Sequence, residues 1–148
     1  MKARAPTPAT DDRRVALVAL HLRAGWIAVL VFATLGLAIE GLNGFKVGWY
    51  VGLASETRRL MWTLAHAHGV LLGVLNIAFA ATVGLRAGAP TPGHNLASRC
   101  LLAATVLMPA GFLLGGAFIY AGDPGFGILL VPVGGLLLLA AIVAVLRA

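Results

Sequence analysis

Charged residues are scarce in this 148-residue chain. Lys, Arg, Asp and Glu together make up 11% of it, and apolar residues make up 60%. Soluble domains carry about 25% charged residues, so too little polar surface is present to cover a globule in water. A single cysteine, Cys100, excludes an internal disulfide and a cysteine-based metal site. We interpret Cys100 as a small packing residue.

Acidic residues are also few, with five against eleven Lys and Arg, for a net charge of +6. The basic residues nevertheless stand almost entirely in the N-terminal segment and at the ends of apolar runs. No basic helix interleaved with aromatic residues is present to follow a phosphate backbone. The sequence therefore excludes nucleic acid as a partner.

Long uncharged runs are the main positive feature of the sequence. The runs 60–85, 100–122 and 124–146 contain 26, 23 and 23 residues without a charge. About 20 apolar residues cross a hydrocarbon core. A fourth run, 24–39, becomes long enough if 15–22 joins it across Arg23. We therefore predict an all-α, integral membrane four-helix up-down bundle in a lipid bilayer, with helices over 15–40, 59–85, 99–121 and 126–147.

The distribution of Lys and Arg predicts the orientation. Seven lie in the N-terminal segment, the second connection and the C-terminus, three lie in the first connection, and none lies in the third. The positive-inside rule then places both termini in the cytoplasm, in a multi-pass protein of the inner (plasma) membrane. We expect residues 1–14 to be a disordered cytoplasmic tail and residues 15–148 to form the four-transmembrane-helix domain. The first apolar run is too long for a cleaved signal peptide.

Two histidines inside the second predicted span need an explanation. His66 and His68 point about 200° apart on a regular helix, so they do not clamp one metal ion. His66 shares its face with Gly69 and Gly73, a spacing that lets another backbone or a flat ring approach. The face of His68 is rich in leucine and is predicted to meet lipid or a second subunit. A buried imidazole that only packs is the other interpretation of His66.

The remaining polar residues favour structural roles. His21 is predicted to lie at the membrane boundary, and His94 to lie in a loop without chemistry. Asn76 is predicted to hydrogen-bond between helices. Tyr120 and the tryptophans are predicted to belong to aromatic belts at the interface.

Glu40 ends the first predicted helix at the outer side and is expected to pair with Arg58 or Arg59. Together with His66 and Tyr120, these residues predict a pocket in the outer half of the bundle.

The segment Leu64–Ala80, LAHAHGVLLGVLNIAFA, resembles the hydroxylaminobenzene mutase and styrene oxide isomerase group of small membrane isomerases. Those proteins have four membrane helices, and a histidine on the second is followed by a glycine pattern. The matching positions here are Ala65, His66, Gly69, Leu71, Gly73, Ile77 and Ala78. Leu72 stands where the family has an asparagine, and 106–118 lacks the polar residues expected in the third helix.

The resemblance implies a haem-dependent isomerase, an intramolecular oxidoreductase or mutase that acts on a small hydrophobic epoxide or arylhydroxylamine. It implies that His66 ligates the iron of haem b, while Gly69 and Gly73 make room for the ring. Ferric iron then acts as a Lewis acid on the substrate oxygen. A homo-oligomer is expected, because four short helices enclose little volume.

Two other functions fit the sequence. The first is a non-catalytic small subunit or assembly factor of a larger respiratory or photosynthetic membrane complex, which needs only short loops and apolar helix faces. The second is a small proton-coupled exporter, which needs a buried carboxylate near the middle of the first helix. Residues 26–37 contain no acid, which disfavours the exporter.

Overall fold

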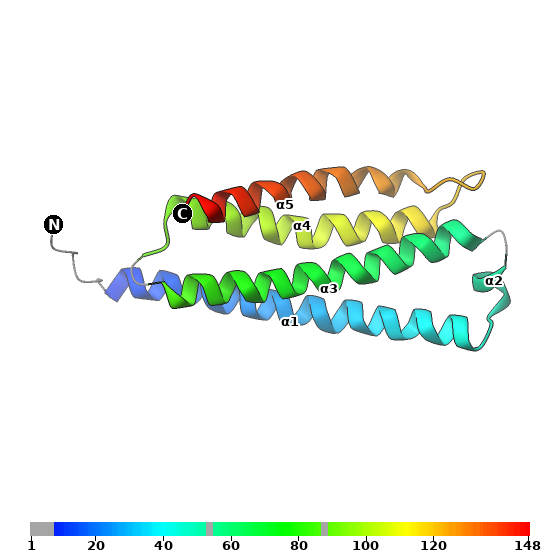
Figure 1. Ribbon diagram of the computed structural model, residues 1–148, viewed down its shortest axis with the longest axis horizontal. Helices are drawn as coiled ribbons and strands as arrows, with labels where there is room; N and C mark the ends of the chain where they lie inside the picture. Colours follow the sequence, from blue (N-terminus) through cyan, green and yellow to red (C-terminus); the bar gives the residue numbers. More distant parts are fainter. Residues whose placement is uncertain (1–7, 53–54, 87–88) are drawn as a thin grey trace.

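The computed structural model is built almost entirely from helices (Figure 1). It describes residues 8–52, 55–86 and 89–148. The elements, in chain order, are α1 (Pro8–Gly44), α2 (Gly48–Val51), α3 (Glu56–Leu85), α4 (Pro92–Ala117), the 3-10 turn η2 (Phe126–Leu129) and α5 (Leu130–Leu146).

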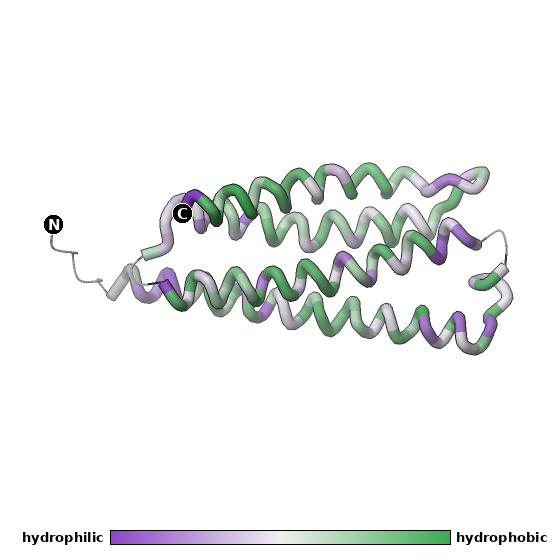
Figure 2. Tube along the Cα trace, viewed as in Figure 1, coloured by the Kyte–Doolittle hydropathy of each residue, from purple (hydrophilic) through white to green (hydrophobic). Residues whose placement is uncertain are grey.

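Four of these helical segments are long and apolar enough to cross a membrane. They include α1, α3, α4 and the segment Phe126–Leu146, which joins η2 to α5. Hydrophilic residues gather toward the two ends of the bundle, and apolar residues fill its length (Figure 2). The predicted all-α four-helix fold of a membrane protein is therefore confirmed. We call the end of the bundle that holds the start of α1 and the C-terminus the terminal end, and the other end, which holds α2, the loop end (Figure 1).

The helices form two antiparallel hairpins, α1 with α3 and α4 with α5. The two hairpins join where α3 packs on α4, and α1 and α5 make no contact with each other in the described part of the chain. Half of the most apolar 18-residue stretch of α4 is buried inside the bundle. The corresponding stretches of α1 and of Phe126–Leu146, which contains α5, are each 17% buried. The bundle therefore has a central pair of helices, α3 and α4, and two largely uncovered outer helices.

Two helices begin seven residues earlier than the sequence predicts. Helix α1 starts at Pro8 and not at Val15, so residues 8–14 of the expected disordered tail are helical, while residues 1–7 lie outside the described residues. In this first part, a carboxylate oxygen of Asp11 lies 3.2 Å from a guanidinium nitrogen of Arg14. The same guanidinium donates a 3.0 Å hydrogen bond to the carbonyl oxygen of Arg86. The hydrogen bond from Arg14 to Arg86 connects the start of α1 to the end of α3.

The N-terminus of α4 corrects a predicted loop. The segment 86–98 was expected to connect two helices, yet α4 already begins at Pro92. The Thr91 hydroxyl accepts a hydrogen bond from the backbone N–H of His94, and Nδ1 of His94 accepts one from the backbone N–H of Thr91. This reciprocal cap, followed by proline at the first helical position, starts a helix efficiently. His94 is therefore a buried helix residue.

Candidate functional site

His66 lies inside the bundle, ten residues after the start of α3, or about 15 Å along the helix. Its Nδ1 atom lies 2.7 Å from the carbonyl oxygen of Phe32 on α1. A carbonyl oxygen only accepts hydrogen bonds, so we assign the proton of the neutral imidazole to Nδ1. The lone pair then lies on Nε2, the atom with which a histidine in this state binds a metal.

A glycine on α1 makes space for this imidazole. A Cβ atom placed on Gly36 would collide with the His66 ring, at both its Cε1 and Nδ1 atoms. Gly36 is one turn beyond Phe32 on the same helix, so both residues present their backbone to the ring. Gly36 could not be predicted from the sequence, because its partner lies 30 positions away on another helix.

Gly69 and Gly73 accommodate helix α1. A Cβ atom on Gly69 would collide with the aromatic ring of Phe32. A Cβ atom on Gly73 would lie 2.9 Å from the carbonyl oxygen of Gly25 and 3.0 Å from the backbone nitrogen of Val29. Of the two predicted uses of this glycine pair, the structure therefore shows the approach of another backbone.

His68 faces α4, which corrects the prediction that its face meets lipid or a second subunit. Its ring centroid lies 4.9 Å from that of Phe112. Its Nδ1 atom lies 2.9 Å from the carbonyl oxygen of Leu64, within α3 itself. Leu72 and Phe79, which lie on the same predicted face of α3 as His68, belong to the hydrophobic core. His66 and His68 thus contact different helices, as their angular separation predicts.

His21 is the centre of a polar network that the sequence analysis missed. Its side chain is fully buried. Nδ1 lies 2.7 Å from Oδ1 of Asn76 on α3, and Nε2 lies 2.8 Å from the hydroxyl oxygen of Ser98 on α4. Asn76 also donates through Nδ2 to Thr105 Oγ1, at 2.8 Å, and to the carbonyl oxygen of Leu72. The network links α1, α3 and α4.

The hydrogen-bond directions in this network follow from Asn76. Because its Nδ2 group donates two hydrogen bonds, its Oδ1 atom is the acceptor for His21 Nδ1–H. Nε2 of His21 then accepts from the Ser98 hydroxyl. Both ring nitrogens are therefore used within the protein, so His21 has a structural role between the helices. The interhelical hydrogen bonds predicted for Asn76 are present.

The loop end carries an aromatic cluster around Tyr50 of α2. Tyr50 is fully buried, and its ring stacks on that of Trp62 with a centroid separation of 6.0 Å. Its hydroxyl has no hydrogen-bond partner among the described residues. Burial raises the pKa of this phenol above its ordinary value, with a smaller opposing effect from the positive charge of Arg59. Nothing in the sequence pattern around Tyr50 predicted this buried position.

Glu40, Arg59, His66 and Tyr120, which were predicted to share a pocket, do not together line any of the four hollows identified among the described residues. Glu40 is exposed, and the one ion pair found in the described ranges joins Asp11 to Arg14. The expected pairing of Glu40 with Arg58 or Arg59 is therefore wrong. Those two guanidinium groups instead donate to the carbonyl oxygens of Gly116 and Val51, respectively. Tyr120 is 83% exposed, at the turn that follows α4.

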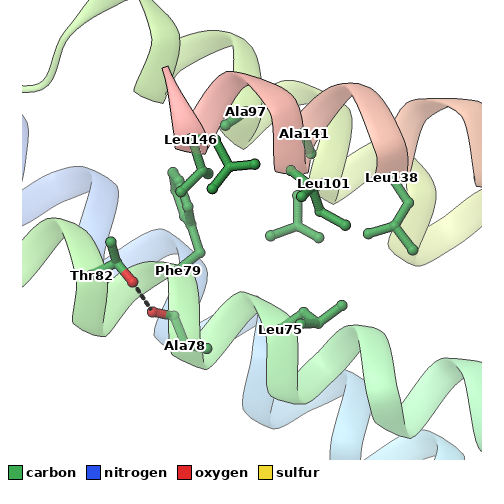
Figure 3. A pocket seen from close by; sticks show the side chains of 11 residues that line it. Leu75, Ala78, Phe79, Thr82, Ala97, Leu101, Leu138, Ala141 and Leu146 are labelled. Carbon is green, nitrogen blue, oxygen red and sulfur yellow. Dashed lines mark hydrogen bonds between the residues drawn. The ribbon is translucent and has the colours of Figure 1, made fainter. Parts of the chain in front are cut away.

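An apolar hollow of about 200 Å³ lies between α3, α4 and α5 near the terminal end (Figure 3). Leu75, Phe79 and Leu138 are among the residues that line it. Thr82 is its one polar side chain, and its hydroxyl donates to the carbonyl oxygen of Ala78 at 2.9 Å. No lining side chain is left to position a reacting group, so this hollow offers no chemistry.

His66 is thus the residue whose chemistry fits an iron ligand. Within the part of the chain that the structure describes, no three His, Cys, Asp or Glu side chains gather around one point. A single imidazole suits haem, since the porphyrin itself provides four of the nitrogen ligands. The donor fits this group, whereas the two glycines predicted to hold its ring are occupied by α1. Comparison of the chain with protein-family models, curated proteins and solved structures finds no match.

Proposed function

We propose that this membrane protein binds haem b through Nε2 of His66 and isomerises a small hydrophobic substrate of the epoxide or arylhydroxylamine type. One observation carries the proposal. The Nδ1–H group of His66 is held by the Phe32 carbonyl oxygen at 2.7 Å, which leaves the Nε2 lone pair for a metal. Metal-bound histidines commonly donate their other ring N–H to a backbone carbonyl in this way.

Residues of this chain would orient and tune the iron ligand. The Phe32 carbonyl oxygen fixes the tautomer and orientation of the His66 ring, and Gly36 lets the ring lie against α1. Bound haem would supply a ferric Lewis acid for the substrate oxygen. The bundle is apolar along most of its length (Figure 2), which would keep bulk water away from the proposed site, and a hydrophobic substrate would enter from the bilayer. Gly69 and Gly73 would act by holding α1 and α3 together.

The orientation proposed for the chain has both termini in the cytoplasm, in the inner (plasma) membrane. Among the described residues, five arginines stand near the terminal end and three Lys or Arg stand near the loop end, with Arg23 inside α1 not counted. We also propose a homo-oligomer, because α1 and α5 leave most of their apolar surface uncovered. A neighbouring copy would cover part of this surface and enlarge the space available to a ring-sized ligand.

An absorption spectrum tests the haem proposal. Protein produced with haem supplied and purified in mild detergent should show a Soret band, and His66→Ala should lose it. His68→Ala is the matched control on the same helix and should keep it, because His68 faces α4. Wild-type protein without a Soret band would refute haem binding. A band that persists in His66→Ala would refute the assignment of the ligand.

Catalysis needs a separate assay. Haem-loaded protein should convert an aryl epoxide to a carbonyl isomer, or an arylhydroxylamine to an aminophenol, without any added redox partner. Loss of turnover in His66→Ala together with the Soret band would support the proposed chemistry. Protein that shows the band but no turnover with either substrate class would bind haem for another purpose.

The alternative is a non-catalytic small subunit or assembly factor of a larger respiratory or photosynthetic complex. Its specific support is that α1 fills the space in front of Gly69 and Gly73, while the outer helices remain largely uncovered. This function predicts that the protein co-purifies with a larger membrane complex in mild detergent. Isolation as a solitary homo-oligomer would count against it.

A further inference from the structure

A basic hollow of about 510 Å³ lies between the first turns of α1 and α4 at the terminal end. Arg13 on α1 and Arg99 on α4 line it from opposite sides, together with Asn95. All three side chains are exposed. The wall below them is apolar and includes Leu17 and Leu20. The hollow thus combines two guanidinium groups and an amide with a hydrocarbon wall.

The two arginines are available for an anion. Neither side chain has a hydrogen bond or an ion pair to any described residue, whereas Arg14 is held by Asp11 and the carbonyl oxygen of Arg86. The acids Glu40, Glu56 and Asp123 all stand near the loop ends of their helices or in the turn there. Asp11 and Asp12 are therefore the acids near this hollow, and Asp11 pairs with Arg14.

An apolar hollow of about 420 Å³ continues along the same two helices. On α1, the lining of this second hollow begins at Ala24, one helical turn after Leu20 of the basic hollow, and includes Val31. On α4, it follows Arg99 and extends from Leu102 to Leu113. His21 and Ser98, which neighbour the lining residues Leu20 and Arg99 in the sequence, are buried and hydrogen-bond α1 to α4 at 2.8 Å.

The length of this groove matches a lipid chain of one leaflet. From Leu20 to Val31 the helix advances eleven residues, or about 16 Å at 1.5 Å per residue. The hydrocarbon core of a bilayer is about 30 Å thick, so the half that belongs to one leaflet has a length similar to that of the groove. The basic hollow stands at the headgroup end of this length. A lipid phosphate next to Arg13 and Arg99 would therefore place its acyl chain against Ala24 and Val31.

We propose that the α1–α4 groove binds an anionic phospholipid from the leaflet at the terminal end. The headgroup phosphate contacts Arg13, Arg99 and Asn95, and one acyl chain lies along the apolar part of the groove. Charge complementarity selects this occupant, because basic pockets between membrane helices bind anionic headgroups. A second copy of the chain would place two like-charged hollows against each other and is disfavoured. This inference does not depend on haem binding by His66.

Native mass spectrometry of the detergent-purified protein tests the proposal with phosphatidylglycerol and phosphatidylcholine as probes. Phosphatidylglycerol should remain bound and phosphatidylcholine should not. The double variant Arg13→Gln/Arg99→Gln should bind phosphatidylglycerol about tenfold more weakly. Arg23→Gln/Arg147→Gln removes the same charge outside the groove and should bind as the wild type does. Equal loss in the two double variants would overturn the site.

The acyl chain is tested separately. Ala24→Phe fills the apolar part and leaves both arginines in place, so phosphatidylglycerol binding should fall, while Ala33→Phe, on α1 but outside the groove, should have no effect. Unchanged binding in Ala24→Phe would overturn the assigned path of the chain. Displacement of the lipid by inorganic phosphate at equal concentration would show a free-anion site, and loss of an oligomer in Ala24→Phe would show a second copy there. Either result would overturn the proposal. Circular dichroism of each variant verifies its helical content.

Discussion

Gly25 and Gly73 face each other across the α1–α3 interface without room for a side chain on either. A Cβ atom on Gly25 would lie 2.7 Å from the carbonyl oxygen of Gly73, and one on Gly73 would lie 2.9 Å from the carbonyl oxygen of Gly25. Backbone approach of this kind stabilises helix pairs in membranes through van der Waals packing. The α1–α3 hairpin, which places Phe32 next to His66, therefore depends on this glycine pair.

Gly73→Ala should lower the free energy of unfolding by about 1–3 kcal/mol, because the new methyl group overpacks against the α1 backbone. Thermal unfolding in a fixed detergent measures this change. Gly84→Ala is the control on the same helix, where the nearest atom to a new Cβ, on Val18, is 3.8 Å away. If both variants melt at the same temperature, the close approach of the two helices is not a source of stability.

The buried His21 network should contribute measurable coupling energy between helices. His21→Phe leaves Asn76 Oδ1 and the Ser98 hydroxyl without their partner, which costs about 1–3 kcal/mol for a buried polar group. A double-mutant cycle with Ser98→Ala should give a coupling of about 1 kcal/mol, near the values found between membrane helices. Strictly additive effects would contradict the hydrogen bond. Thr82→Val, which removes an exposed hydroxyl, should change little.

The membrane fold was predictable because the long uncharged runs determine it. Uncharged runs longer than 20 residues must satisfy their backbone hydrogen bonds internally in lipid, so helices were expected over 59–85 and 126–147 and are found at Glu56–Leu85 and Phe126–Leu146. The helix starts at Pro8 and Pro92 were missed for a different reason. Capping by Thr91 and His94 and the contact of Arg14 with Arg86 depend on local geometry that hydropathy does not contain.

The candidate site was predictable only in part. His66 stands out because an imidazole inside a membrane span needs a partner. Its actual partners, Phe32 and Gly36, belong to another helix and look ordinary in the sequence. His21 was assigned to the boundary because a nearby arginine suggested water. Its burial follows from the register of α1 against α3 and α4, which no single helix encodes.

The free energy of unfolding should fall at high pH because of Tyr50. Its pKa is raised by burial from the ordinary 10.0, so the folded protein keeps this proton at pH values where the unfolded chain loses it. Its contribution is constant below about pH 10 and falls as the pH rises above that value. In a Tyr120→Phe background, Tyr50 is the one remaining tyrosine. Absorbance of the phenolate then reports its titration, which should occur above pH 10.

Tyr50→Phe should keep or increase thermal stability at neutral pH. The substitution removes a buried hydroxyl that has no described partner, and it retains the ring stacked on Trp62. Trp62→Ala is the contrasting variant, because it removes the stacked ring itself and should destabilise the protein. A clear loss of stability in Tyr50→Phe would show that the hydroxyl has a hydrogen-bond partner.

Gly36→Ala should weaken haem binding although it leaves His66, the proposed iron ligand, unchanged in the sequence. The new methyl group collides with the His66 ring, which must turn away from the Phe32 carbonyl oxygen. Loss of such a supporting hydrogen bond costs about 10–100-fold in metal affinity. Haem titration followed at the Soret band measures the change. Gly41→Ala, on the same helix with nothing within 4 Å of its Cβ, controls for the higher helix propensity of alanine. Equal haem affinity in the two variants would show that the position of the His66 ring against α1 does not determine binding. Thermal unfolding of the haem-free variants then tests the packing independently, since the collision in Gly36→Ala exists with or without a cofactor.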